Sequence, residues 1–173
     1  MNDTDIFVRR AEAGDVAALA SIGTTTYVET FGHIYSDKDL ATFLSENRNE
    51  AYFEPYLSDD RFCVWLVECD GAAIGYGLAG PCTLPVPDMP PNSGELVHMY
   101  LSAAHQGRGV GRRLMAEIMG WLKENFDQLY LCVFSENKTA QNIYQRNGFE
   151  KIMDHVFMVG DHADAEWIMA KKR

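Results

Sequence analysis

Residues 106–113 read Gln-Gly-Arg-Gly-Val-Gly-Arg-Arg, and they follow an apolar stretch at 95–101 that predicts a β-strand. Glycines let the backbone turn tightly and approach a ligand without interference from a Cβ atom. The residues after them read as the start of a helix, where free N–H groups and the helix dipole attract an anion. Arg108, Arg112 and Arg113 add positive charge to an otherwise acidic chain. The segment therefore predicts a site for a phosphate-bearing ligand.

Two common phosphate-binding patterns do not fit this segment. The dinucleotide fingerprint G-x-G-x-x-G fails because Arg112 stands at the position of its third glycine. The P-loop pattern fails because the segment contains no Gly-Lys followed by Ser or Thr. A nicotinamide or flavin oxidoreductase is therefore disfavoured. The alternative to a ligand site is that these glycines simply shape a turn.

The composition limits the class of protein. The 173 residues, 47% of them apolar, fit one domain with a core. Acidic residues outnumber basic ones 25 to 15, a net charge of −10, so no nucleic-acid partner is expected. This charge serves solubility, or it attracts a cationic substrate. Residues 1–10 include Asp3 and Arg9, and no stretch reaches the roughly 20 apolar residues of a membrane span. We expect a cytoplasmic protein with no membrane partner.

The cysteines and histidines give no sign of a metal site. The four cysteines form no C-x-x-C pair, and the five histidines show no H-x-x-x-H spacing. Cys63 and Cys132 lie inside apolar runs and read as small core residues with free thiols. We therefore expect no bound metal.

The order of elements predicts one mixed α/β domain over residues 1–173. Apolar runs predict strands, stripes at helical spacing predict helices, and Asp70-Gly71 predicts a hairpin turn. Ser36 and Asp39 resemble a capping box, and Gly148 reads as a left-handed helix cap. The expected strands are 6–11, 61–70, 72–82, 95–101, 128–134, 149–158 and 164–170. The expected helices are 14–31, one from 36, 49–57, 107–124 and 137–147, and 84–93 is a proline-rich loop.

A second motif identifies a family. Residues 137–149 read NKTAQNIYQRNGF, which resembles the pattern N-x-x-A-x-x-x-Y-x-x-x-G-F of the GNAT superfamily of N-acetyltransferases. The glycine segment matches that family's Q/R-x-x-G-x-G/A motif at Gln106, Gly109 and Gly111. The two motifs occur in the family's order, separated by one strand.

The resemblance extends to the PaiA-type polyamine acetyltransferases. Segments 22–36 and 155–171 look like theirs, and H-x-F-x-x-G-D is complete from His155 to Asp161. The family usually has an aspartate where this chain has Glu166, and many members have an arginine in place of His98. These two departures concern the identity of the substrate.

The resemblance implies a fold and a cofactor. The GNAT fold is a single α/β domain with a mixed, mostly antiparallel sheet of six to seven strands, flanked by about four helices. A bulge in strand 95–101 would splay it from strand 128–134. The splayed strand would bind acetyl-coenzyme A, with backbone amides on the pyrophosphate and Asn137 on the pantetheine arm. The implied cofactor contacts are Met99, Tyr100, Leu101, Gln106, Gly107, Arg108, Gly109, Val110, Gly111, Arg112, Asn137 and Tyr144.

The predicted reaction is direct attack of a primary amine on the thioester. Tyr144 is our choice of general acid, because its phenol can protonate a departing thiolate. Glu95 is our choice of general base, with Glu29 and His98 as competitors. Glu95 and His98 differ by an odd number of residues, so an unbulged strand would place them on opposite faces.

The acceptor is expected to be a polyamine or a similar small cationic amine. Aromatic rings and carboxylates suit its methylenes and ammonium groups. The expected acceptor contacts are Tyr27, Glu29, Phe31, Tyr35, His98 and His155. Several of these also read as ordinary core residues. The alternatives are an acetyltransferase for protein N-termini or lysines and a non-catalytic acyl-coenzyme A-binding module. The family also implies a homodimer as a candidate assembly.

Overall fold

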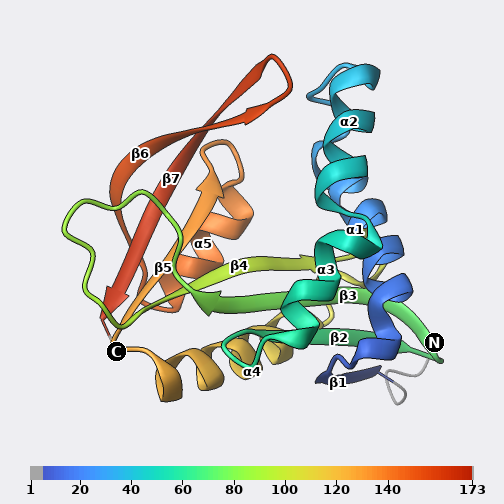
Figure 1. Ribbon diagram of the computed structural model, residues 1–173, viewed down its shortest axis with the longest axis horizontal. Helices are drawn as coiled ribbons and strands as arrows, with labels where there is room; N and C mark the ends of the chain where they lie inside the picture. The colour runs from blue at the N-terminus through green and yellow to red at the C-terminus, as the bar shows by residue number, and fades with distance from the viewer. Residues whose placement is uncertain (1–5, 173) are drawn as a thin grey trace.

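A computed structural model of the chain describes residues 6–172. Within them, one seven-stranded sheet has the order β1-β2-β3-β4-β5-β7-β6 (Figure 1). Its pairs are antiparallel except for β4 and β5, which run parallel. The strands are β1 (Ile6–Arg10), β2 (Cys63–Cys69), β3 (Ala72–Pro81), β4 (Ser93–Leu101), β5 (Gln128–Phe134), β6 (Glu150–Val159) and β7 (His162–Lys172). The helices are α1 (Val16–Phe31), α2 (Asp37–Asn47), α3 (Glu50–Ser58), α4 (Val110–Asn125) and α5 (Lys138–Arg146), with 3-10 turns η2 (Ala13–Asp15) and η3 (Ala103–His105).

Helices cover both faces of the sheet. Helix α4 lies against one face, and α1 and α3 lie against the other (Figure 1). On the α4 face, Leu114, Ile118 and Leu122 pack on Leu96 in the largest apolar cluster. On the α1 face, a second cluster includes Leu19, Phe53, Leu66, Tyr76 and Leu78. These two layers confirm the predicted mixed, mostly antiparallel sheet flanked by helices.

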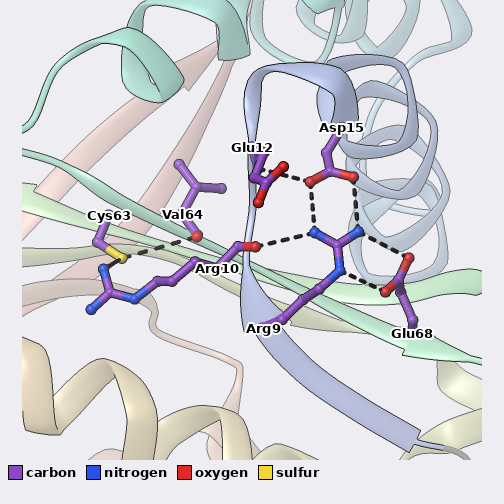
Figure 2. A network of polar contacts seen from close by, with 7 residues as sticks. All are labelled: Arg9, Arg10, Glu12, Asp15, Cys63, Val64 and Glu68. Carbon is purple, nitrogen blue, oxygen red and sulfur yellow. Dashed lines mark hydrogen bonds and ion pairs between the residues drawn. The ribbon is translucent and has the colours of Figure 1, made fainter.

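A charged network fastens β1 to its neighbours. The guanidinium of Arg9 binds both carboxylate oxygens of Asp15 at 2.7 and 2.9 Å and bridges to Glu68 on β2 (Figure 2). The next residue, Arg10, turns the other way, contacts the Cys63 thiol and lies 4.9 Å above the Trp65 ring. Two adjacent arginines therefore hold the edge strand from both faces.

Strand β4 contains one residue more than its partner. Leu78 pairs with His98 and Ala79 pairs with Leu96, so Val97 is an extra residue, a β-bulge. Pairing of β4 with β5 runs from Ser93 to Leu96 and ends there. We call the place where the two strands separate the fork; residues 97–101 of β4 and 132–134 of β5 line it. The bulge predicted for this strand is present, and the strands separate beside it.

Several predicted boundaries shift for clear physical reasons. The helix expected over 107–124 begins at Val110, because Gly107 and Gly109 have φ of 76° and 82° and cannot continue a right-handed helix. The helix expected from residue 14 begins at Val16, after the short turn η2. The last strand expected over 164–170 extends from His162 to Lys172, because it pairs with strands on both sides. The Ser36 cap and the Asp70-Gly71 turn form as predicted.

The hairpin of β6 and β7 reaches over to α2 (Figure 1). Phe157 on β6 contacts Phe43 on α2, with ring centroids 6.0 Å apart. Below them, the Tyr35 hydroxyl donates a hydrogen bond to Asp164 on β7. The chain segment before α2 and the last hairpin are therefore in direct contact.

Gly75 allows β3 to approach β4 closely at the outer end of the fork. A Cβ atom here would lie 2.6 Å from the Tyr100 carbonyl oxygen, which is backbone and cannot give way cheaply. We predict that Gly75→Ala lowers the free energy of unfolding by about 1–3 kcal/mol, measured by chemical denaturation.

Gly120 provides the matched control for this substitution. It lies inside α4 with nothing within 4 Å of an added Cβ atom, so Gly120→Ala should raise the free energy of unfolding by about 0.5–1 kcal/mol. Equal effects of the two variants would show that the contact with Tyr100 is unimportant.

Candidate active site

The fork leaves one edge of β4 without a strand partner. From Val97 to Leu101, β4 pairs with β3 alone among the described strands. Apart from the Leu101 carbonyl, which accepts a hydrogen bond from Gln106, its backbone N–H and C=O groups on the β5 side have no strand partner and can bind an extended ligand, as an added strand would. Met99, Tyr100 and Leu101, the predicted main-chain contacts, all lie on this stretch.

The glycine segment, residues 106–113, follows β4 after the short turn η3 and contains the first residues of α4. Gly109 is the N-cap in a left-handed conformation, and the first helical bond runs from the Arg113 N–H to its carbonyl. The N–H groups of residues 110–112 consequently have no partner within the helix. Space around Gly107 and Gly109 is open, since no atom lies within 4 Å of a built Cβ. Exposed Arg108 and Arg112 flank this loop.

Gln106 ties the loop back to the strand. Its side-chain amide donates to the Leu101 carbonyl at 2.9 Å, which fixes the turn between β4 and α4. Asn137 has a local role as well, because its Oδ1 accepts from the Ala140 N–H at 3.1 Å and caps α5. The Nδ2 group of Asn137 is then the part of the side chain that the predicted pantetheine contact would use.

Tyr144 lies on α5 and packs against the apolar cluster of the α4 face, as Met99 and Leu101 also do. Its ring meets Phe149 at a centroid distance of 6.3 Å. Burial, with a smaller contribution from Tyr100, raises the pKa of the Tyr144 phenol. The hydroxyl therefore keeps its proton across the neutral range, which suits a proton donor.

Glu95 lies at the closed end of the fork and is 6% exposed. One of its carboxylate oxygens accepts from the Thr83 N–H at 2.9 Å and from the Thr83 hydroxyl at 3.3 Å. Burial raises the pKa of Glu95, and these hydrogen bonds oppose the rise. Because Val97 is extra, Glu95 and His98 point to the same face of the sheet. The opposite-face arrangement expected for an unbulged strand does not occur.

His98 is packed among aromatic rings. Its ring stacks on Tyr52 at 5.9 Å, and its Nδ1 lies 3.3 Å from the Tyr76 hydroxyl. Burial, followed by the nearby positive charge of Arg48, lowers the pKa of His98 well below its usual value of 6.5. His98 therefore lies on the stretch of β4 that lines the fork, but its imidazole is neutral and its Nδ1 faces the Tyr76 hydroxyl.

Arg48 is a buried cation surrounded by aromatic rings. It is 4% exposed, and its guanidinium lies 4.9 Å from the Tyr27 centroid and 5.8 Å from that of Tyr100. Its Nη1 donates to the Asn47 carbonyl, whereas its Nε has no hydrogen-bond partner among the described residues. Cation–π contacts and tyrosine hydroxyls replace a carboxylate partner here.

The predicted acceptor residues occupy different depths. Tyr27 and Tyr35 are buried, and the Tyr27 hydroxyl donates a hydrogen bond to the Tyr35 hydroxyl at 3.3 Å. The Tyr35 hydroxyl in turn donates a hydrogen bond to Asp164. Phe31 is closer to the fork, where its ring meets Phe134 of β5 edge-on at 5.9 Å. Glu29 is exposed, and its Oε2 accepts from the Ala103 N–H at 2.9 Å, so this carboxylate caps η3.

Two residues near the fork were not among the predicted site residues. The Cys132 thiol donates to Glu166 Oε2 at 2.8 Å, and Cys132 is the first residue of β5 beyond its pairing with β4. His155, a predicted acceptor contact, pairs with Glu166 across the β6–β7 hairpin. Burial raises the pKa of both Cys132 and Glu166. The sequence signal for Glu166 is a second carboxylate, two residues after Asp164, in the first half of the last strand.

The family is shown by comparison with known proteins. Residues 25–149 match the model of the acetyltransferase (GNAT) family. This span is well over half of the chain, so the protein belongs to that family, and the predicted class of enzyme, an acyltransferase, is confirmed. A relative of similar length is the uncharacterised N-acetyltransferase of the pepI 3′ region of Lactobacillus delbrueckii subsp. lactis. It is 27% identical over 97% of this chain and 98% of its own.

Solved structures confirm the fold. The PaiA N-acetyltransferase of Thermoplasma acidophilum, in complex with coenzyme A, superposes with a TM-score of 0.77 at 20% identity, covering 98% of this chain and 100% of its own. The yncA acetyltransferase of Salmonella typhimurium, with its cofactor acetyl-CoA, gives 0.68 at 18% identity, covering 98% and 94%. At these identities the likeness establishes the GNAT fold and does not transfer a substrate.

Between residues 6 and 172, no helix combines the length and apolarity that crossing a membrane requires. In the same part of the chain, no three His, Cys, Asp or Glu side chains come together as a metal site.

The depressed pKa of His98 makes a pH prediction. The folded state binds fewer protons at His98 than the unfolded state, so stability falls as pH drops below about 6.5. The contribution of one such group is about 1.4 kcal/mol per pH unit, until the folded pKa is reached. His98→Phe should unfold with a correspondingly smaller pH dependence between pH 7.5 and 5.5. Parallel curves for the two proteins, measured by urea denaturation, would contradict the burial of a neutral imidazole.

Proposed function

We propose that the protein transfers an acetyl group from acetyl-coenzyme A to a primary amine by direct attack on the thioester. The observation that carries this proposal is the fork. Beyond Leu96, β4 loses β5 as a partner, and the free edge leads straight to the left-handed glycines at the start of α4. An extended ligand that ends in phosphates fits this combination of free strand edge and helix N-terminus.

The residues present fit coenzyme A. The N–H groups of 110–112, with Arg108 and Arg112 nearby, supply donors and positive charge for a pyrophosphate. The backbone of 99–101 and the amide of Asn137 would hold the pantetheine arm. Acetyl-CoA as the cofactor is confirmed for this family by its solved relatives.

In this proposal the proton donor lies on the α4 face of the sheet, and the amine binds on the α1 face. The bound cofactor supplies an activated acetyl thioester. Free N–H groups of β4 in the fork stabilise negative charge that develops on the carbonyl oxygen. Tyr144, on the α4 face, gives its phenolic proton to the departing sulfur. The amine approaches from the α1 face, where Phe31 and Phe134 exclude water near the fork.

We take the acceptor to be a polyamine or a similar small cationic amine. The support is the negative charge of the chain and the three carboxylates near the fork on the α1 face, Glu95, Asp164 and Glu166, among aromatic rings. The PaiA enzyme among the solved relatives points the same way. A protein N-terminus or lysine is the alternative acceptor, and a non-catalytic module is the alternative to an enzyme.

A thiol-release assay tests the proposal directly. Purified protein with acetyl-CoA and spermidine, spermine or putrescine should release free coenzyme A, detected with a thiol reagent. Amino acids and short peptides in the same panel should release none. Turnover with peptides alone would show that the acceptor is a protein N-terminus or lysine and would contradict the polyamine proposal. Binding of coenzyme A without turnover on any amine would contradict the enzymatic proposal.

Replacement of Tyr144 tests the proton donor. Tyr144→Phe keeps the ring in its apolar contacts and removes the hydroxyl. We expect kcat to fall by about 100-fold or more, because one general acid contributes 10² to 10⁴ in rate, while the Kd for coenzyme A stays the same. Tyr130→Phe, on β5 at the closed end of the fork, serves as the control. An unchanged kcat for Tyr144→Phe would remove this residue from the mechanism.

A further inference from the structure

Glu166 is attached to the fork by its hydrogen bond. It pairs with Phe134 across β5 and β7, so both side chains share the face that carries α1. Its Oε2 reaches back along β5 to the Cys132 thiol at 2.8 Å. Cys132 follows Leu131, the last residue of β5 that pairs with β4. The carboxylate therefore lies beside the point where the two strands separate.

The charge of Glu166 also acts on the other side of the fork. It contributes to the raised pKa of Tyr100, which lies on the free part of β4. The groups that face Glu166 are Cys132 on β5, His155 on β6, Asp164 on its own strand and Tyr100 on β4. The Glu166 carboxylate thus interacts with both strands of the fork, through a hydrogen bond with Cys132 on β5 and electrostatically with Tyr100 on β4.

The other carboxylates near the fork have local hydrogen-bonding partners. Glu95 accepts two hydrogen bonds from Thr83 at the closed end of the fork. Glu29 accepts from the Ala103 N–H on the surface. Asp164 is bonded to Tyr35 and to His162 at 2.9 Å. Glu166 has a thiol as its hydrogen-bond donor, and a thiol is the weakest donor among these groups.

We infer that Glu166 is the general base of the acetyl transfer and accepts a proton from the acceptor's ammonium group. This inference rests on the proposed function and replaces Glu95 in the role predicted from the sequence. A primary ammonium ion has a pKa near that of lysine, about 10.4, so it needs an acceptor for its proton before it can attack. A carboxylate held in a partly buried position beside the fork provides that acceptor.

The proton balance follows from the two roles. Glu166 takes one proton from the ammonium and passes it to solvent, and this is the net proton released. The nitrogen lone pair then forms the new C–N bond as the C–S bond breaks. Tyr144 gives a proton to the sulfur and regains one from the acylated nitrogen. Burial raises the pKa of Glu166 above 4.5, and the Cys132 hydrogen bond counteracts part of that rise.

The first test compares three variants that each replace one carboxylate by an amide. Glu166→Gln should lower kcat by at least about 100-fold and abolish the acid limb of the pH–rate profile, with little change in the Kd for coenzyme A. Glu95→Gln should keep that limb. Glu124→Gln, an exposed position on α4, should behave like the parent protein. Loss of the acid limb in Glu95→Gln and its retention in Glu166→Gln would overturn the inference.

The second test does not depend on folding of the amide variant, and one of its two readouts, the carboxyl resonance, does not require turnover. Cys132→Ala removes the hydrogen bond that favours the ionised form of Glu166, so the acid limb should move to higher pH. In ¹³C-glutamate-labelled protein, the carboxyl resonance that is missing from Glu166→Asp should titrate above 4.5 and shift upward in Cys132→Ala. An unshifted limb and an unshifted resonance would overturn the inference. If the parent protein releases no thiol, the proposed function fails instead.

Discussion

Val97 adds one residue to β4 that β3 does not match, and the strand departs from β5 at this point. The backbone groups of a sheet are normally satisfied by pairing between strands. An interior strand that loses its partner therefore exposes N–H and C=O groups that can bind a ligand. Here the opening is followed within a few residues by glycines at positive φ and the exposed start of α4. The bulge, the free strand edge and the helix N-terminus are therefore parts of one arrangement. Gln106 holds it together by bonding the loop to Leu101.

The two faces of the sheet at the fork differ in chemistry. The α4 face is apolar, and Tyr144 brings a protonated phenol into it. The α1 face carries Glu95, Cys132 and Glu166 on one side and Arg48 among aromatic rings on the other. Burial shifts the carboxylates toward holding a proton and keeps His98 neutral. In the proposed mechanism, this separation places the proton donor and the proton acceptor in different environments on the two faces of the sheet.

Much of the architecture could be predicted because local signals agreed with one another. The motif at 137–149 and the glycine segment fixed the family, and the apolar runs located every strand. The end of the glycine loop was predicted wrongly because a helical stripe does not reveal that Gly107 and Gly109 adopt positive φ. The position of Glu95 on its strand is predicted correctly, but its hydrogen bonds to Thr83 are not, because Thr83 lies between the end of β3 and the proline-rich loop, where no periodic pattern describes the path of the chain. Glu166 was noted as a departure from the family, but its link to Cys132 depends on the β5–β7 register.

The odd residue at Val97 also makes the length of β4 critical. Side chains of a strand alternate between faces, so removing one residue here would exchange the faces of everything after it. Met99 and Leu101 would turn from the apolar cluster toward the α1 face, and Tyr100 would turn from Arg48 toward the α4 face. Deletion of this one residue would therefore change the side chains on both faces of the fork at once. Substitutions can change the side chains on each face of β4 one at a time, whereas the number of residues between Leu96 and the glycine segment cannot change without exchanging the faces.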